Sequence, residues 1–250
     1  MPSAPVARYP WLTPFLASHG IGALIDHTLL RPEAAEDDLQ RLAAEAVRLG
    51  LGAVCVNGQW VLAMAHQLHG TGVKVASVVG FPLGATGRLA KVAETRMAIE
   101  NGADEIDMVI SLGLVKSGRW AEVEDEVAAV VDVRGGRLVK VILETAALTV
   151  DEMLRGAEVA VMAGAGMVKT STGFHSAGGA TLEAVQLLRH VVGNGVGVKA
   201  SGGIRTGEQA VVMLAAGASR LGTSSAALWA DVLGPAAPSL ASLLSPSTDD

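Results

Sequence analysis

Eight short apolar runs alternate with helix-like patterns along the chain, and this alternation constrains the fold more than any other feature. Most runs are rich in valine and isoleucine and are too short for helices, so we interpret them as strands. Repeated strand–helix units predict a parallel sheet of the α/β class, and eight of them favour a closed (β/α)8 TIM barrel. An open, doubly wound sheet is the alternative. The runs are residues 24–27, 53–57, 73–79, 105–110, 138–144, 167–171, 196–201 and 220–223.

The chain has 250 residues, of which 50% are hydrophobic. That is enough for one large core, so we predict a single barrel domain over residues 1–233. Residues 8–20 are interpreted as an extra N-terminal helical segment that covers the barrel floor. Residues 234–250 are rich in Pro, Ala and Ser, which predicts a flexible tail.

Several classes of protein are disfavoured by composition. The formal net charge of −6 argues against a nucleic-acid partner and against an anionic-membrane anchor. No apolar run is long enough for a membrane span, and the N-terminus lacks the pattern of a signal peptide. The single cysteine, Cys55, cannot form an intrachain disulfide, which fits a reducing compartment. We therefore expect a cytoplasmic protein that binds neither nucleic acid nor membrane.

Two lysines occupy similar positions in successive strands. Lys169 and Lys199 each end an apolar run and are followed by small polar residues and glycine. Burial of an ammonium group is unfavourable, so a lysine in such a strand suggests a function. A neutral amine beside a second cation is the arrangement that Schiff-base chemistry requires. The alternative for each lysine alone is a solvated side chain at the end of a sheet, and we interpret Lys74 and Lys140 in that way.

The paired lysines predict a lowered pKa for one of them. A free lysine has a pKa of about 10.4, so roughly one in 2,500 is neutral at pH 7. A second ammonium about 5 Å away costs about 3 kcal/mol at an effective dielectric near 20, or about 2.4 pKa units. Asp107, on the fourth strand, is a candidate for moving protons through water, although a carboxylate there is also an ordinary hydrogen-bond acceptor. Asp104 and Glu105 are interpreted as solvated or floor residues.

Glycine-rich loops follow the last two strands, where phosphate often binds in barrels of this kind. The seventh strand continues into Ser201-Gly202-Gly203, and the eighth into Gly222-Thr223-Ser224-Ser225. Gly173 lies in the loop before them. Because glycine allows close approach of a ligand to backbone N–H groups, these loops predict a phosphate site. His66 and His69 lack a third ligand nearby, so no metal site is predicted.

These motifs resemble the bacterial deoxyribose-phosphate aldolases, a family of class I aldolases. The resemblance covers nearly the whole chain. Its most specific parts are residues 105–109, 168–174 and 198–205, and residues 25–30, 54–57, 80–84 and 222–225 also fit.

The resemblance implies a (β/α)8 barrel that reversibly cleaves 2-deoxy-D-ribose 5-phosphate into acetaldehyde and D-glyceraldehyde 3-phosphate, in deoxyribonucleotide catabolism. It implies that Lys169 forms the Schiff base, that Lys199 lowers its pKa and that Asp107 relays protons. No metal or organic cofactor is expected, and family members are commonly dimers or tetramers. The substrate and its phosphate would contact Gly173, Gly202, Gly203, Gly222, Ser224 and Ser225, with Asp26, Thr28 and Asn57 lining the pocket more peripherally.

The chain departs from the family pattern at two points. Phe174 stands where some members carry a lysine, which predicts weaker phosphate selectivity. Some members also end in a tyrosine that assists proton transfer, whereas the only tyrosine here is Tyr9. A different Schiff-base aldolase, a sugar-phosphate isomerase and a non-catalytic sugar-phosphate sensor are the alternative functions. An isomerase or a sensor would have little use for the paired lysines.

Overall fold

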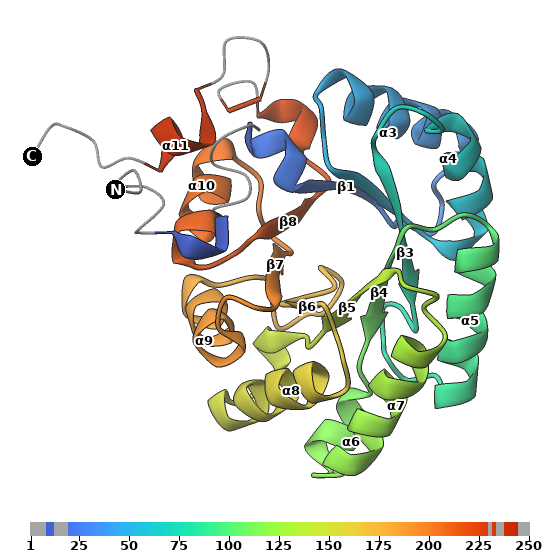
Figure 1. The fold of residues 1–250 in the computed structure, drawn as a ribbon, viewed down its shortest axis with the longest axis vertical. Coiled ribbons are helices and arrows are strands. Elements are labelled where there is room, and N and C mark those ends of the chain that lie inside the picture. The colour runs from blue at the N-terminus through green and yellow to red at the C-terminus, as the bar shows by residue number, and fades with distance from the viewer. Residues whose placement is uncertain (1–8, 13–19, 230–231, 234–237, 245–250) are drawn as a thin grey trace, which may run out of the picture.

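Eight parallel strands close into a barrel in the computed structural model, which describes residues 9–12, 20–229, 232–233 and 238–244. The strands follow one another around the barrel in chain order, and β8 pairs with β1 (Figure 1). The predicted (β/α)8 barrel is therefore confirmed, and the open sheet is excluded. The strands are β1 (Ile25–Leu29), β2 (Ala53–Val56), β3 (Lys74–Val79), β4 (Glu105–Val109), β5 (Leu138–Ile142), β6 (Met167–Lys169), β7 (Gly197–Ser201) and β8 (Arg220–Thr223).

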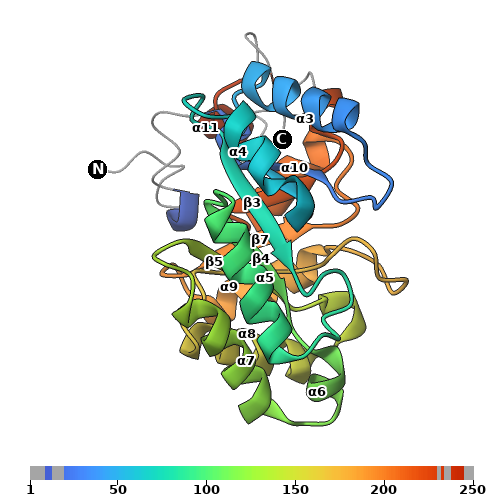
Figure 2. The same cartoon turned by 90° about the vertical axis from the view of Figure 1, so that its right-hand side faces the viewer.

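Helices connect the strands and form an outer layer, in which α4 and α5 lie outside β3 (Figures 1 and 2). The α-helices are α3 (Glu36–Arg48), α4 (Val61–Gln67), α5 (Arg88–Glu100), α6 (Leu112–Lys116), α7 (Trp120–Asp132), α8 (Val150–Met162), α9 (Leu182–Val192), α10 (Gly207–Ala216) and α11 (Leu240–Leu243). Short 3-10 helices are η1 (Pro10–Leu12), η2 (Ile21–Leu24), η3 (Gly58–Trp60), η4 (Thr145–Ala147) and η5 (Ala226–Leu228).

Local sequence signals set several helix ends. Capping boxes open α8 and α10, where Thr149 and Thr206 each accept a hydrogen bond from the N–H three residues later. Helix α3 buries Leu39, Leu42 and Ala46 on one face, as the helical spacing predicts. It begins at Glu36, and the three acidic residues of its first turn interact favourably with the positive end of the helix dipole.

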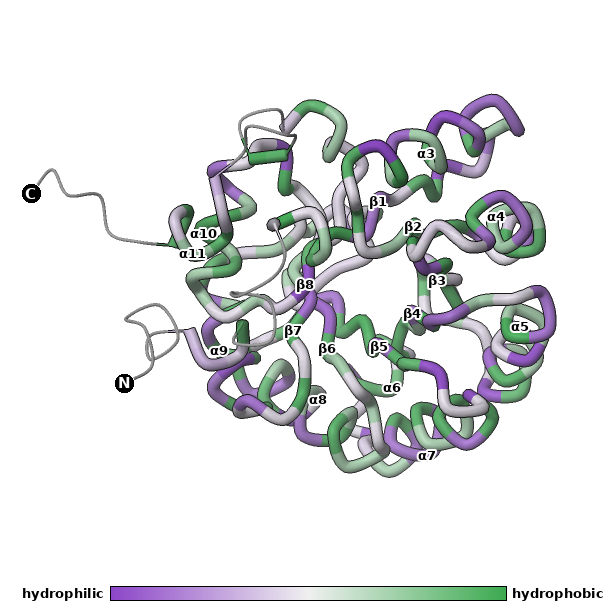
Figure 3. Tube along the Cα trace, turned by 45° about the horizontal axis from the view of Figure 1, so that its top comes forward, coloured by the Kyte–Doolittle hydropathy of each residue, from purple (hydrophilic) through white to green (hydrophobic). Residues whose placement is uncertain are grey.

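The apolar core lies mainly between the barrel and the helices. Ile106 and Met108 on β4 belong to this core, whereas Glu105 and Asp107 alternate with them and face the barrel interior. Hydrophobic and hydrophilic residues are interspersed along the helices (Figure 3). The interior of the barrel differs from this apolar core, since charged side chains occupy it.

The described part of the predicted N-terminal segment lies at the barrel floor. Trp11 lines a small cavity with Met167, Gly197 and Arg220, which begin β6, β7 and β8. Its indole Nε1 donates to the carbonyl of Leu214, 3.1 Å away. Within the predicted segment 8–20, residue 8 and residues 13–19 lie outside the described residues.

Helix α11 falls within the tail predicted to be flexible. Its Leu240 and the following Leu244 are buried in the main core, so this part of the tail is packed against the domain. Residues 234–237 and 245–250 lie outside the described residues. In the part of the chain that is described, no helix is long and apolar enough to cross a membrane.

Candidate active site

Lys169 and Lys199 meet at the ends of neighbouring strands. The two residues are register partners across β6 and β7, and both side chains point into the barrel. Each Nζ donates to the same oxygen of Asp107, Oδ2, at 2.8 Å from Lys169 and 2.7 Å from Lys199. Lys169 is 2% exposed, and the other two are fully buried. The structure thus brings the three predicted catalytic residues into direct contact.

Lys140 belongs to the same cluster, and its interpretation as a solvated residue is wrong. Its side chain is fully buried, and its Nζ donates to Asp107 Oδ1 at 2.7 Å and pairs with Glu105 at 2.6 Å. The reason is the register of the barrel, in which Lys140 on β5 lies opposite Asp107 on β4 and faces inward with it. Lys74 is exposed, as predicted, and lies 3.5 Å from Glu105.

Arg220 and the contacts that it makes in the lower half of the cluster were not predicted from the sequence. Arg220 on β8 crosses the barrel to Glu105 on β4 and donates to both carboxylate oxygens at 3.0 and 2.9 Å. Asp26 accepts hydrogen bonds from Arg220, Lys199 and Lys140. Glu105 is thus a floor residue, one of its two predicted roles, and it is buried rather than solvated.

The buried charges balance only if one lysine is neutral. Three carboxylates, on Asp26, Glu105 and Asp107, face four cationic side chains, on Lys140, Lys169, Lys199 and Arg220. Lys169 has one ion-pair partner among the described residues, Asp107, whereas each of the other three cations has at least two. Loss of the Lys169 proton therefore gives an electroneutral interior, which burial favours.

The pKa directions agree with this balance. Burial lowers the pKa of Lys169, and the neighbouring Lys199 ammonium lowers it further, against the attraction of Asp107. Burial alone would also lower the pKa of Lys199, but Asp107 and Asp26 raise it above its ordinary value. Burial would raise the pKa of Asp107, yet Lys140, Lys169 and Lys199 hold it well below its usual range. Lys169 is thus the amine that most readily loses its proton.

A cavity of about 560 Å³ opens above this cluster at the carboxyl ends of the strands. Lys169 lies in its wall, while Lys199 and Asp107 lie beneath it. Asp26 belongs to the buried cluster, and Asn57 lines a separate cavity of about 330 Å³, so neither of these two lines the main one. The predicted substrate residues in its lining are Thr28, Gly173, Gly202, Gly203, Gly222, Ser224 and Ser225.

The backbone around this cavity can receive an anion. Gly173 and Gly203 both have φ of +84°, a conformation that favours glycine. The N–H groups of Gly173, Gly203 and Ser224 donate to no other group among the described residues. Backbone N–H groups left free in this way form anion-binding sites. Gly222 has a different role, because a Cβ there would lie 3.0 Å from Cε of Lys199.

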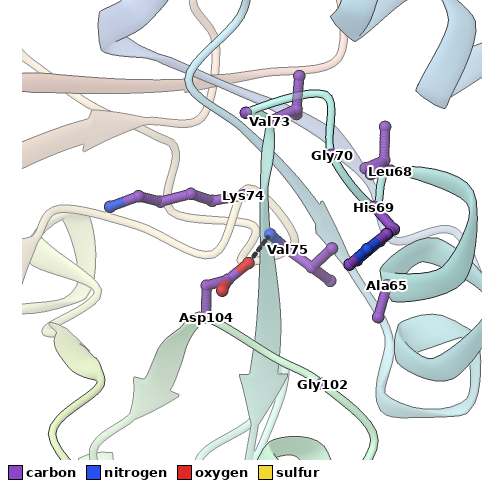
Figure 4. Close-up of a pocket in the computed structure, with 10 residues that line it drawn as sticks. Ala65, Leu68, His69, Gly70, Val73, Lys74, Val75, Gly102 and Asp104 are labelled. Carbon is purple, nitrogen blue, oxygen red and sulfur yellow. Dashed lines mark hydrogen bonds between the residues drawn. The ribbon is translucent and has the colours of Figure 1, made fainter.

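Another cavity lies at the opposite end of the barrel, and none of the predicted catalytic or substrate-binding residues lines it. It measures about 400 Å³ and is formed around the starts of β3 and β4. Asp104 accepts a hydrogen bond from the N–H of Val75 there, and Lys74 points away from His69 (Figure 4). Among the residues described, the lining of this cavity contains neither Lys169 nor the glycine loops, which line the cavity at the carboxyl ends of the strands.

Comparison with known proteins identifies the family. The sequence profile described as DeoC/LacD family aldolase matches residues 22–227. The chain belongs to this aldolase family. The deoxyribose-phosphate aldolase of Streptococcus equi subsp. zooepidemicus is 52% identical to it over 204 residues, which are 82% of this chain and 92% of that protein. The corresponding protein of Brevibacillus brevis is 53% identical over 201 residues, 80% of this chain and 90% of its own.

The structural comparison agrees. The tetrameric deoxyribose phosphate aldolase from Aeropyrum pernix superposes with a TM-score of 0.79 at 36% identity, covering 91% of this chain and 96% of that one. The likeness extends over almost the whole barrel in both proteins. The family and the fold expected from the sequence motifs are therefore confirmed, and the chain is a lyase of the aldolase type.

The mouth of the cavity in this DeoC/LacD aldolase contains groups that sequence analysis did not select. Arg31 and Arg205 both line it, so cationic side chains are present although residue 174 is not lysine. Phe174 packs edge-on against Phe81, with ring centroids 5.2 Å apart. Arg205 lies at the end of a motif that the sequence did single out. Arg31 had no signal beyond its position shortly after β1.

Proposed function

We propose that this aldolase reversibly cleaves 2-deoxy-D-ribose 5-phosphate to acetaldehyde and D-glyceraldehyde 3-phosphate through a Schiff base on Lys169. The observation that carries the proposal is the sharing of Asp107 between Lys169 and Lys199 in an interior that is electroneutral when Lys169 is neutral. The names of relatives more than 50% identical support the substrate.

In the cleavage direction, the neutral Lys169 amine attacks the C1 aldehyde carbon of the open-chain sugar. Loss of water from the carbinolamine gives a protonated imine. Deprotonation of the C3 hydroxyl then breaks the C2–C3 bond, whose electron pair moves toward the imine and leaves an enamine. C3 departs as the aldehyde carbon of glyceraldehyde 3-phosphate. Protonation of the enamine at C2 and hydrolysis of the imine release acetaldehyde and free Lys169.

The other buried residues keep this sequence running at neutral pH. Lys199 stays charged between Asp26 and Asp107 and disfavours the ammonium form of Lys169. Asp107 takes and returns protons through water, as its contact with Lys169 allows. The protonated imine is itself the electron sink, so the proposed reaction uses no metal or organic cofactor.

The phosphate group occupies the other end of the cavity in this proposal. The free N–H groups of Gly173, Gly203 and Ser224 receive its oxygens, with Gly202, Gly222 and Ser225 completing the loops. Thr28 lines the sugar end. Arg205 supplies the positive charge that Phe174 does not, whereas Arg31, also in the lining, is ion-paired with Asp38 and Glu33. Asp26 and Asn57 contribute from outside the cavity, Asp26 by holding Lys199.

Reductive trapping tests the proposal. With acetaldehyde and borohydride, peptide mass spectrometry is expected to find a reduced two-carbon unit on Lys169, and a Lys169→Met variant is expected to remain unlabelled there. Cleavage of deoxyribose 5-phosphate, followed by coupled reduction of the aldehyde products, is expected to fail in the same variant. Labelling at Lys74 or Lys140 instead would contradict the assignment of the nucleophile to Lys169. No labelling at all would contradict the Schiff-base mechanism and favour an isomerase or a sensor.

We further propose a role in deoxyribose phosphate catabolism in the cytoplasm, as part of a homo-oligomer. The reducing compartment is supported by the single cysteine, Cys55, which is buried and unpaired. The oligomer is supported by the tetrameric relative from Aeropyrum pernix. Light scattering coupled to size-exclusion chromatography measures the assembly directly, and a monomeric mass would contradict it.

A further inference from the structure

Glu144 has an unusual backbone and an unusual carboxylate. It follows β5 with φ of 59° and ψ of 56°, and it is the one non-glycine residue with positive φ among the described residues. Such a conformation is disfavoured for a residue with a side chain and persists only where surrounding contacts hold it. The side chain is 1% exposed and forms no ion pair within the described part of the chain.

The hydrogen bonds to the Glu144 carboxylate all come from one residue among those described, Thr172. The N–H of Thr172 donates to both carboxylate oxygens, at 3.2 and 3.3 Å, and its hydroxyl donates to Oε2. The same hydroxyl oxygen accepts the N–H of Phe174 at 3.0 Å. A continuous set of hydrogen bonds therefore runs from the Glu144 carboxylate through Thr172 to Phe174. It closes a turn whose central residue is Gly173.

The far side of this loop is fixed by β7. The N–H of Ala180 donates to the carbonyls of Ser201 and Gly202 at 3.1 and 3.0 Å. Gly202 lies so close to Gly173 that a Cβ on Gly202 would be 3.4 Å from the Gly173 Cα. The loop after β6 is thus held between the end of β5 and the end of β7. Gly173 is left with an N–H that has no partner among the described residues.

We infer that Glu144 is a positioning residue for the substrate phosphate, acting through Thr172 to aim the free N–H of Gly173 into the cavity. The inference rests on the proposed function and adds a residue that lies outside the cavity wall. Thr172, Gly173 and Phe174 line the cavity, whereas Glu144 does not. The left-handed backbone at Glu144 is what allows its side chain to turn from β5 toward the neighbouring loop. Because Glu144 lies outside the cavity lining, its carboxylate is not expected to contact the reacting carbons of the sugar.

The test compares two substrates in matched variants. Glu144→Ala removes both acceptor oxygens and leaves a buried N–H without a partner, so KM for deoxyribose 5-phosphate is expected to rise about tenfold or more. For unphosphorylated deoxyribose, kcat/KM is expected to stay within about threefold of the parent. Glu144→Gln keeps one acceptor oxygen and is expected to restore most of the loss. Asp104→Ala removes the same kind of carboxylate–N–H bond at the opposite end of the barrel, and kcat/KM is expected to stay unchanged for both substrates.

Each outcome decides the question. An equal loss for both sugars in Glu144→Ala would overturn the inference, as would unchanged kinetics. If that variant does not fold, Thr172→Val serves instead, because it deletes the hydroxyl link at constant volume, and Thr172→Ser is its conservative control. Failure of the proposed function is separable, since the parent protein would then cleave neither sugar. In that case, a thermal-shift titration with inorganic phosphate tests the role of Glu144 alone. Phosphate is expected to stabilise the parent more than Glu144→Ala, and equal stabilisation of the two proteins would overturn the inference.

Discussion

Lys169 and Lys199 are register partners on adjacent strands, and both amines donate to one oxygen of Asp107. A shared acceptor keeps the two nitrogens close without fixing a proton on each. Lys199 has Asp26 as a second anionic partner, whereas Lys169 has no second one among the described residues, so the two amines differ in proton affinity although their strand positions match. The nucleophile is therefore distinguished by its neighbours rather than by its own strand.

Lys199→Leu is expected to lower turnover at pH 7 on the order of a hundredfold. Burial still lowers the pKa of Lys169, but the substitution removes the cation that lowers it further and leaves Asp107 to raise it, so the pKa rises. A raised pKa means that the neutral amine returns only as pH increases, and activity is expected to recover toward alkaline pH. The measurement is the pH profile of kcat/KM, and an unshifted profile would refute the like-charge argument.

Lys140→Met is expected to destabilise the fold strongly, since it removes the ammonium that contacts Asp107 and Glu105 directly and leaves these buried carboxylates with an unfilled partner position. Breaking a buried network by removing one partner typically costs about 3–5 kcal/mol. Lys74→Met is the matched control, because Lys74 is exposed and lies 3.5 Å from Glu105, and exposed pairs contribute about 1 kcal/mol at most. Urea unfolding gives both values. Equal effects of the two substitutions would show that burial of Lys140 has no energetic consequence.

Gly222→Ala is expected to reduce activity about tenfold with a modest loss of stability. The added methyl would lie 2.9 Å from Cβ of Ser201 and 3.0 Å from Cε of Lys199, so Lys199 must move, and overpacking costs about 1–3 kcal/mol. Gly113→Ala in α6 is the control, because a Cβ there meets nothing within 4 Å. Steady-state kinetics measure the activity of both variants, and thermal melts measure their stability. Full activity in Gly222→Ala would argue that Lys199 tolerates displacement.

Ser224→Asp is expected to separate the phosphorylated from the unphosphorylated substrate. A carboxylate about 4–5 Å from the phosphate repels it by about 3–4 kcal/mol at an effective dielectric near 20, so KM for deoxyribose 5-phosphate rises steeply. Deoxyribose carries no such charge, and its slow cleavage should persist. The ratio of kcat/KM for the two sugars is measured in parent and variant. A parallel loss with an unchanged circular dichroism melt would place Ser224 outside the phosphate site.

Much of the architecture and the upper part of the site could be predicted from the sequence. Strand ends carry the polar residues in a parallel barrel, so Lys169, Lys199 and the glycine loops follow from local patterns. Lys140 and Lys74 show where this approach fails. Lys74 is the first residue of β3 and is exposed at the barrel floor, whereas Lys140 is the third residue of β5, lies opposite Asp107 and is fully buried. Depth within the barrel depends on register with the neighbouring strand, which a single strand pattern does not encode.

Contacts across the barrel could not be predicted from the sequence either. Arg220 and Glu105 are separated by 115 residues and come from β8 and β4. No pattern within one strand–helix unit encodes such a pair. Glu144 carried a weaker signal still, since a left-handed glutamate is the opposite of what local preference predicts. These residues are recognised only once the barrel has closed.

The seven charged residues inside the barrel have a consequence for how this enzyme can be altered. An apolar interior tolerates exchange of one side chain for another of similar volume, but here each group is a counter-ion to at least one other. Single changes leave a charge stranded, so viable redesign of the interior has to proceed through compensated pairs. The loops at the mouth are free of that coupling, which makes them the part of the molecule where new substrate preferences can be acquired one residue at a time.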